Sequence, residues 1–397
     1  MTGKERLLAA IKGETVDRPP TWLREGFNIG GDIKKEPLVD VLGEEGDLEF
    51  ILGWKDDPLY RELFEYVSLY ADTMRSWDIG GCLNRFFLIP PEYIHRKSER
   101  VDHDTVWING WIDTPSGRLT FRDELRRGVN TYWRINHLVN SVEELEALAE
   151  VPFHFNPDDI REHLKTFRNA HQELGERGIM RIEYPSPIAT ISATMSFEDF
   201  LTFSITERDL FHELLQEITR RLLMITEVIF TSPYFTEDNL VSIVNFGGSE
   251  QCTPPMMAPQ AFDEFVVPYD GKIIAWLKKH DILVNMHCHG KVGHALKCMV
   301  EMGVDSTDPV EPPPAGDVSF RKAREISGGE LTLIGNIEFD ELENTDEEHI
   351  HQRVFDLLTQ GPRRLILGSS SGPISALTPR LMGNYRAWID AYRKFYN

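Results

Sequence analysis

The chain has 397 residues, and 41% of them are hydrophobic, so it is long and apolar enough to bury a large core. Its 42 Lys and Arg residues face 64 Asp and Glu residues, which gives a formal net charge of −22. This charge repels nucleic acids and anionic membranes, and no basic tract offsets it, which argues against a polyanion-binding function.

The N-terminal segment "MTGKERLLAAIKGE" is expected to form a helix capped by Thr2, with Glu5 in capping-box spacing. It lacks the apolar centre of a signal peptide, and no run of about 18 apolar residues occurs in the sequence. The cysteines form no CxxC pair, which is typical of a reducing compartment: Cys82, Cys252, Cys288 and Cys298. We therefore expect a soluble cytoplasmic protein without a membrane span.

Short apolar runs alternate with amphipathic segments along most of the chain, which indicates strands joined by helical crossovers. Strands are expected at 19–25, near 73–81, and at 178–184, 240–246, 282–288, 303–307, 331–336 and 364–368. Eight such strands predict a closed (β/α)8 barrel of the TIM type with an N-terminal helical extension. Since neither a repeat nor a low-complexity linker is present, we expect a single domain over residues 1–397.

Residues 106–124, "VWINGWIDTPSGRLTFRDE", alternate in polarity around a "TPSG" turn and predict a β-hairpin. This hairpin is expected to be the centre of an insertion at about 100–135, beside the C-terminal mouth of the barrel. Two interpretations of its aromatic residues stay open, a lid over the mouth or simple packing of the insertion onto the barrel. These residues are Trp107, Trp111, Tyr132 and Trp133.

The stretch "ILVNMHCHG" ends a predicted strand with His287, Cys288 and His289. Because side chains alternate along a strand, the two imidazoles are expected on one face and Cys288 on the other. An H-x-H pair at the C-terminal rim of a barrel suits a divalent metal such as Zn²⁺. The alternative is a pair of hydrogen-bonded rim histidines. His294, in the following helix, is expected to be a surface or packing residue.

Other polar residues are predicted at the same rim. Glu250 follows a Gly-Gly turn, where it could be the third metal ligand or a general base, or simply a solvated acid. Further rim acids are expected at Asp305, Glu311 and Glu338. Residues expected to share a cleft with His287 as substrate-binding groups are Trp22, Arg24, Glu183, Tyr184 and Asn336. Glu183 and Tyr184 are adjacent, so at most one of them should reach its centre.

The last predicted strand runs into "GSSSGPISALTPRL", a Ser/Gly loop that contains Ser371 as a further candidate for substrate binding. The helix after this loop is expected to begin at Pro379, with Thr378 as its N-cap. Loops at this place in barrels often hold phosphate at a helix N-terminus, but no Lys or Arg lies within this one.

Several segments together resemble the uroporphyrinogen decarboxylase superfamily over nearly the whole chain. They are "KERLLAAIKGETVDRPPTWLRE", "MAPQAFDEFVVPYDGKIIAWLKKH" leading into "VNMHCHG", "EMGVDSTDPVEPPPAGDV", "GNIE" and "GPRRLILGSSSGP". The resemblance implies a (β/α)8 barrel with its cleft at the C-terminal rim. True decarboxylases of this superfamily need no metal and use two arginines to hold substrate carboxylates. Here Arg24 occupies the first arginine position and Asn28 the second.

The other branch, which the chain resembles more closely, consists of cobalamin-dependent methyltransferases that bind zinc through an H-x-C motif and a later cysteine. In this sequence His287 occupies the position of the motif histidine, and His289 replaces the motif cysteine. Ser371 lies at about the position of the later cysteine. The resemblance then implies Zn²⁺ held by His287, His289 and Glu250, an N,N,O set that is more Lewis acidic than one with thiolates.

The leading hypothesis from the sequence is a zinc-dependent methyltransferase that moves a methyl group between an O-methylated substrate, such as a methoxyaromatic, and a corrinoid. The chain has no D-x-H-x-x-G pattern for binding a corrinoid, so a partner protein would carry it. Two alternatives are a decarboxylase-like lyase acting on a tetrapyrrole or polycarboxylate, and a non-catalytic accessory protein that binds metal or corrinoid. A homodimer is the prior expectation for its assembly.

Overall fold

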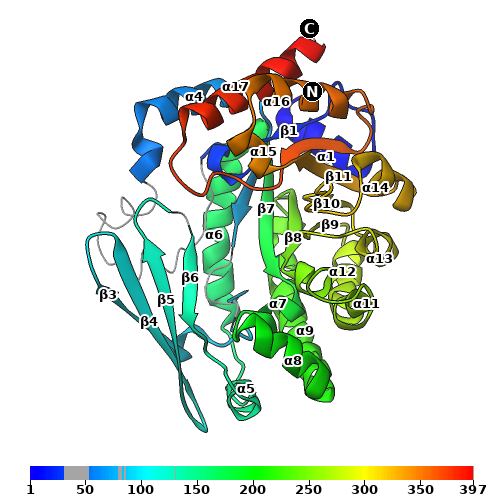
Figure 1. Cartoon of the computed structure of the whole chain (residues 1–397). Coiled ribbons are helices and arrows are strands. Elements are labelled where there is room, and N and C mark those ends of the chain that lie inside the picture. The colour runs from blue at the N-terminus through cyan, green and yellow to red at the C-terminus, as the bar shows by residue number, and fades with distance from the viewer. Residues whose placement is uncertain (31–52, 79–82, 85, 130, 397) are drawn as a thin grey trace.

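A computed structural model of the chain describes residues 1–30, 53–78, 83–84, 86–129 and 131–396. Eight parallel strands form a nearly closed barrel with helices between them (Figure 1). These strands are β1 (Thr21–Trp22), β2 (Thr73–Trp77), β7 (Gly178–Pro185), β8 (Ser242–Gly247), β9 (Leu283–His287), β10 (Ser306–Asp308), β11 (Thr332–Ile337) and β12 (Leu365–Ser369). All eight predicted strands are confirmed, apart from positions 79–81, which, like Cys82, lie outside the described residues.

Helices connect the strands and cover the barrel. The α-helices are α1 (Gly3–Lys12), α4 (Pro58–Ser68), α5 (Val142–Ala149), α6 (Pro157–Leu174), α7 (Pro187–Ser192), α8 (Phe197–Thr206), α9 (Arg208–Phe230), α10 (Pro233–Thr236), α11 (Gln260–Phe265), α12 (Val267–Lys279), α13 (Ala295–Met302), α14 (Phe320–Ile326), α15 (Phe339–Asn344), α16 (Glu347–Leu358) and α17 (Pro379–Tyr396). Short 3-10 turns are η1 (Glu25–Phe27), η2 (Gly53–Asp56), η4 (Pro91–Tyr93), η5 (Gly175–Arg177) and η6 (Ser249–Cys252). No helix in these described ranges is long and apolar enough to cross a membrane.

Helix α1 closes the N-terminal end of the barrel. Its predicted capping box is present, since Thr2 accepts a hydrogen bond from the Glu5 amide and the Glu5 side chain accepts one from the Thr2 amide. Its apolar face joins a cluster made of the first inward residues of the strands. The cluster contains Leu7, Ala10, Ile11, Trp22, Met74, Ile179, Ile243, Leu283, Ile334 and Ile366. The lower half of the lumen is therefore a packed apolar core.

The first and second strands meet without a regular ladder between them. The sheet order runs β1-β12-β11-β10-β9-β8-β7-β2, so β1 and β2 are its two edges. At this seam the Asp72 amide donates to the Thr21 carbonyl oxygen at 2.8 Å, and the Asp72 carboxylate accepts from the Thr21 amide at 3.2 Å. Asn28 links Trp22 to the Met74 carbonyl oxygen through its amide group, at 2.9 and 2.7 Å. Side chains and one backbone bond thus join these edges.

The predicted hairpin is confirmed as part of a larger antiparallel sheet, seen beside the barrel in Figure 1. Its strands are β3 (Ile94–Arg100), β4 (Thr105–Thr114), β5 (Gly117–Arg126) and β6 (Tyr132–Asn136). Two contacts join this sheet to loops at the rim of the barrel. Val129 forms a backbone bridge with Ser375, after β12, and the Arg134 side chain donates a hydrogen bond to the Ala193 carbonyl oxygen, after β7. The sheet therefore lies beside the C-terminal mouth, as expected.

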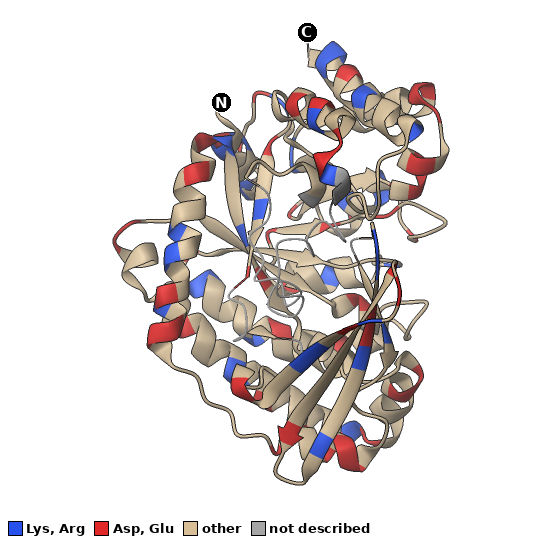
Figure 2. Ribbon diagram, turned by 90° about the vertical axis from the view of Figure 1, so that its left-hand side faces the viewer, with Lys and Arg blue, Asp and Glu red and all other residues tan. Residues whose placement is uncertain are grey.

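Alternation along β4 decides which side chains attach this sheet to the rest of the molecule. Its residues alternate between partly buried and buried, and the buried set includes Ile112, which packs into the main core. The partly buried face carries Trp107 and Trp111, whose rings lie against Arg122 and Arg118 of the neighbouring strand. Aliphatic residues, and not these tryptophans, therefore pack the sheet inward. Figure 2 shows acidic and basic residues interspersed over the sheet and the outer helices.

Candidate functional site

His287 is the last residue of β9, at the C-terminal rim of the barrel, and His289 follows two residues later. Their ring centroids are 4.6 Å apart and the rings are nearly perpendicular. The His287 and His289 side chains keep 25% and 39% exposure, so a ligand can reach them. Cys288, between them, is fully buried in the main core, and burial raises the pKa of its thiol well above the usual value. The strand therefore places the imidazoles and the thiol in different environments.

Each imidazole is held by a carboxylate from the segment that begins with β10. His287 Nδ1 lies 2.8 Å from Asp308 Oδ2, and His289 Nδ1 lies 2.7 Å from Glu311 Oε1. A carboxylate can only accept, so Nδ1 carries the proton in both rings, and each Nε2 keeps a lone pair when the ring is neutral. This arrangement is the one that usually orients metal-ligating histidines.

Asp308 is also the partner of the buried Arg24. Arg24 Nη1 lies 2.5 Å from Asp308 Oδ2, and its Nε donates to the Ser369 carbonyl oxygen at 2.8 Å. Burial alone would raise the pKa of Asp308, but the positive charges of Arg24 and His287 outweigh it and hold that pKa well below its usual value. Arg24, expected to bind substrate, is thus a buried residue that holds Asp308 as an anion.

A layer of polar side chains crosses the lumen below the histidines. Strand register aligns Glu183, Asn245, Asn285 and Ser306 on four neighbouring strands. Asn285 Nδ2 donates to Asn245 Oδ1 at 2.6 Å and also to Asp308, while Asn245 Nδ2 donates to Glu183 Oε2 at 2.6 Å. This network links Glu183, a predicted site residue, to the carboxylate that orients His287.

Glu311 and His289 form the upper ion pair of the rim. Burial would lower the pKa of His289, but its hydrogen bond to Glu311 and the charges of Glu311 and Glu250 raise it overall. For Glu311, burial would raise the pKa, and the bond and charge of His289 outweigh that effect and lower it. The Gly290 amide also donates to Glu311 Oε2 at 2.5 Å. The surroundings of His289 are thus strongly negative.

Two further rim carboxylates each have a buried oxygen without a hydrogen-bond partner among the described residues. They are Oε2 of Glu250 and Oε1 of Glu338. Burial and the charge of Glu311 raise the pKa of Glu338 to about 7. An unpaired buried acceptor is costly, so both oxygens are suited to receive a cation or a donor from a ligand. Glu338 is one of the predicted rim acids, but no pattern in the sequence indicates that it is buried.

The other predicted site residues are not gathered at one point. Tyr184 packs instead against α9 and Phe246 in the main core, where burial raises its pKa, because it lies on the opposite face of β7 from Glu183. Asn336 is buried and accepts from Arg353 of α16. Ser371 lies in the loop after β12, bonded to the Gly372 carbonyl oxygen.

Trp22, the remaining predicted site residue, lies beneath the site. It is 1% exposed, with the guanidinium groups of Arg24 and Arg181 stacked at 4.9 and 4.8 Å from its ring. It therefore supports two buried arginines, and its own indole surface is covered.

The donor set at the rim fits a divalent metal in its chemistry. Two imidazole Nε2 atoms and a carboxylate oxygen are ligands that Zn²⁺ takes in catalytic sites. The ligand atoms of His287, His289 and Glu250 are not grouped within 4.8 Å of one another. Among the described residues, the group found at that spacing lies elsewhere and consists of Asp263, His294 and Cys298. The metal role of the rim histidines stays a prediction.

A (β/α)8 barrel with charged and amide side chains at the C-terminal ends of its strands has the layout of a barrel enzyme. Its sequence also matches the profile of a known family, Uroporphyrinogen decarboxylase (URO-D), over residues 99–395. The chain belongs to this family.

A solved structure that is similar over the whole chain has the same fold. A methyltransferase from Methanosarcina mazei is similar over 100% of both chains, with a TM-score of 0.59 and 20% sequence identity. A B12-independent methionine synthase from Shewanella sp. W3-18-1, in complex with selenomethionine, is similar over 95% of this chain and 96% of its own. Its TM-score is 0.43 and its identity 12%. No curated protein matches the chain.

Proposed function

We propose that the protein is a cytoplasmic methyltransferase that takes a methyl group from an oxygen of a small substrate and passes it to a corrinoid on a partner protein. The observation that carries the proposal is the pair of rim imidazoles whose Nδ1 atoms are both bonded to carboxylates, at 2.8 and 2.7 Å. Membership of the URO-D family and the likeness to a structure named as a methyltransferase support it.

The proposed metal site consists of His287, His289 and Glu250. A Zn²⁺ ion bound there would supply Lewis acidity toward the ether oxygen of a methoxylated substrate. Asp308 and Glu311 keep the two rings in the tautomer whose Nε2 atoms can bind a cation. The unpaired Oε2 of Glu250 is the third donor.

Glu338 is proposed as the proton donor. With a pKa of about 7, its carboxyl group is protonated in a large fraction of molecules at neutral pH. When the methyl carbon–oxygen bond breaks, the oxygen keeps the bonding electrons and takes this proton, while the methyl group goes to the reduced corrinoid, which supplies the new electron pair. The products are a hydroxyl compound and a methylated corrinoid.

The test is incubation of the protein with cob(I)alamin and a panel of methoxyarenes, and separately with uroporphyrinogen. We expect a methoxyarene to be demethylated with formation of methylcobalamin, and uroporphyrinogen to be left unchanged. Decarboxylation of uroporphyrinogen would establish the lyase alternative. Consumption of neither substrate class, with zinc bound, would favour the accessory protein.

Two matched variants on one strand test the metal site. His289→Ala should abolish activity and reduce bound zinc, since it removes one of three proposed ligands, whereas Cys288→Ala should leave both nearly unchanged. Zinc content is measured by elemental analysis and folding by circular dichroism. Loss of zinc in Cys288→Ala but not in His289→Ala would show that the thiol, and not the imidazole, holds the metal.

A further inference from the structure

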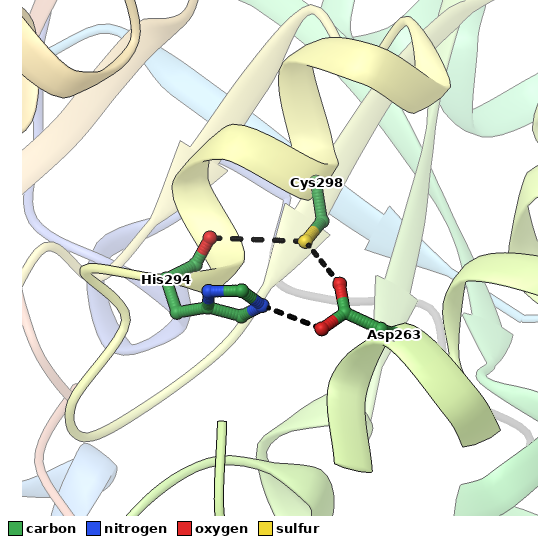
Figure 3. Close-up of side chains that lie close together, drawn as sticks. All are labelled: Asp263, His294 and Cys298. Atoms are coloured by element: carbon green, nitrogen blue, oxygen red, sulfur yellow. Dashed lines mark hydrogen bonds and ion pairs between the residues drawn. The ribbon is translucent and has the colours of Figure 1, made fainter. Parts of the chain in front are cut away.

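A second group of metal-binding side chains lies outside the rim, between α11 and α13. Figure 3 shows Asp263 of α11 facing His294, the N-cap residue of α13, and Cys298 within that helix. His294 Nε2 lies 2.8 Å from Asp263 Oδ2, and Cys298 Sγ lies 3.2 Å from Asp263 Oδ1. We propose that these three side chains form a second, thiolate-containing site for a divalent metal of the zinc type, separate from the site of the proposed function.

The spacing of the ligand atoms supports this assignment. His294 and Cys298 are four residues apart on one helix turn, so both face the same side of α13. In a tetrahedral zinc site with usual bond lengths, the nitrogen–oxygen separation is about 3.3 Å and the sulfur–oxygen separation about 3.5 Å. The observed separations, 2.8 Å to Oδ2 and 3.2 Å to Oδ1 of the same carboxylate, lie close to these values, and the three ligand atoms all lie within 4.8 Å of one another.

Exposure and charge also suit a cation. The Asp263 and His294 side chains are 49% and 37% exposed, so an ion can enter from solvent, while Cys298 is buried behind them. Burial, the hydrogen bond to Asp263 and the negative charges of Asp263 and Glu301 together raise the pKa of the Cys298 thiol to about 12. A bound cation reverses this effect, because it stabilises the thiolate and releases the proton.

A nucleophilic triad is the other arrangement that these residue types suggest, and the contacts argue against it. The imidazole and the thiol both form hydrogen bonds to the carboxylate of Asp263, and within the cluster drawn in Figure 3 no hydrogen bond joins the Cys298 sulfur to a ring nitrogen of His294. A cysteine nucleophile needs a base at its sulfur and a lowered pKa. Metal binding is therefore the chemistry that the geometry supports.

The experiment measures Co²⁺ binding to the full chain in a His287→Ala/His289→Ala background, which removes the proposed rim site. We expect one Co²⁺ to bind with a thiolate-to-cobalt charge-transfer band, a signal that an N,N,O site cannot give. Adding Cys298→Ser should abolish the band and weaken binding at least about tenfold, since even losing a residue that orients a ligand costs about 10- to 100-fold. Cys252→Ser, another buried cysteine, is the matched control and should keep both.

His294→Gln in the same background gives an independent check if Cys298→Ser does not fold, as judged by circular dichroism. It should likewise weaken Co²⁺ binding while leaving the far-ultraviolet spectrum unchanged. Absence of Co²⁺ binding in the double-alanine background, or a charge-transfer band that survives Cys298→Ser, would overturn the proposal. Both results are measured as Co²⁺ binding and do not depend on methyltransferase activity. A negative result for the proposed function would therefore leave the test of this second site unaffected.

Discussion

The lower and upper halves of the barrel lumen are built from the same strands but have opposite chemistry. Ile179, Ile243 and Leu283 fill the lower half, and two residues further along the same strands stand Arg181, Asn245 and Asn285. Since side chains two apart share a face, one step of the strand period separates an apolar core from a charged network. Along these strands, the barrel therefore separates the residues that stabilise the fold from those of the proposed site.

The largest expected effect comes from breaking the upper network. Asp308→Ala leaves Arg24 buried without its anion and His287 without its orienting group, so it should cost about 3–5 kcal/mol of stability. Urea unfolding measures this loss. Asp113→Ala, which removes the acid of exposed pairs with Arg118 and His95, is the control and should cost much less stability. Equal losses of stability in the two variants would show that burial does not determine how much an ion pair contributes to stability.

The lower half should be sensitive in stability alone. Ile243→Ala removes a fully buried side chain from the apolar cluster and should cost about 2–5 kcal/mol. Metal content and activity per folded molecule should be unchanged, because the side chain lies a full layer below the histidines. Chemical unfolding and zinc analysis check the two parts. A folded variant that lost its zinc would contradict the separation between the halves.

Asp270 is a buried carboxylate that, unlike Asp308, has no cationic partner among the residues that the structure describes. Burial raises the pKa of Asp270 from 3.8 to about 8, and its hydrogen bond from Ser186 only partly offsets this. Between about pH 4 and pH 8 the unfolded chain ionises this group while the folded chain keeps the proton, so the group's contribution to stability falls as pH rises.

Asp270→Asn should therefore gain stability relative to the wild type as the pH rises from 5 to 8, by up to about 1.4 kcal/mol per pH unit, because it removes the group that only the unfolded chain ionises in this range. Urea unfolding at both pH values measures the change. Asp209→Asn, an exposed acid, should show no such trend. A difference between Asp270→Asn and wild type that is constant with pH would mean that Asp270 is ionised in the folded protein.

The smallest expected effect lies at the closed end of the barrel. Thr2→Ala removes the side-chain half of the α1 capping box and should cost about 0.5–2 kcal/mol. Thr2→Ser keeps the hydroxyl group and should cost little. Thermal unfolding of both variants distinguishes a loss of capping from a change in packing. A loss in Thr2→Ser as large as in Thr2→Ala would assign the effect to the methyl group.

The fold was predictable because its signals are local. Each strand is a short apolar run, and the capping pattern at Thr2 and the helix start at Pro379 depend on neighbouring residues. The alternation at His287 to His289 predicted the separate environments of the imidazoles and Cys288. These features need no knowledge of distant contacts.

The partners within the site could not be predicted in the same way. Arg24 meets Asp308 from the other end of the chain, and the unpaired oxygens of Glu250 and Glu338 result from burial by many segments. Asp308 itself resembles any other acid after a strand, so its role was missed. His294, expected to be a surface or packing residue, has a half-exposed side chain that contacts Asp263, a residue 31 positions earlier in the chain.

The seam between β1 and β2 gives the barrel one joint of a different kind. Elsewhere around the ring, neighbouring strands share backbone ladders, whereas this joint depends on the carboxylate of Asp72 and the amide of Asn28. Asp72 is in turn held by Arg6 of α1, at 2.6 Å. Helix α1, which closes the N-terminal end of the barrel, therefore also holds β1 and β2 together. We expect unwinding of the N-terminus and separation of these two strands to occur together.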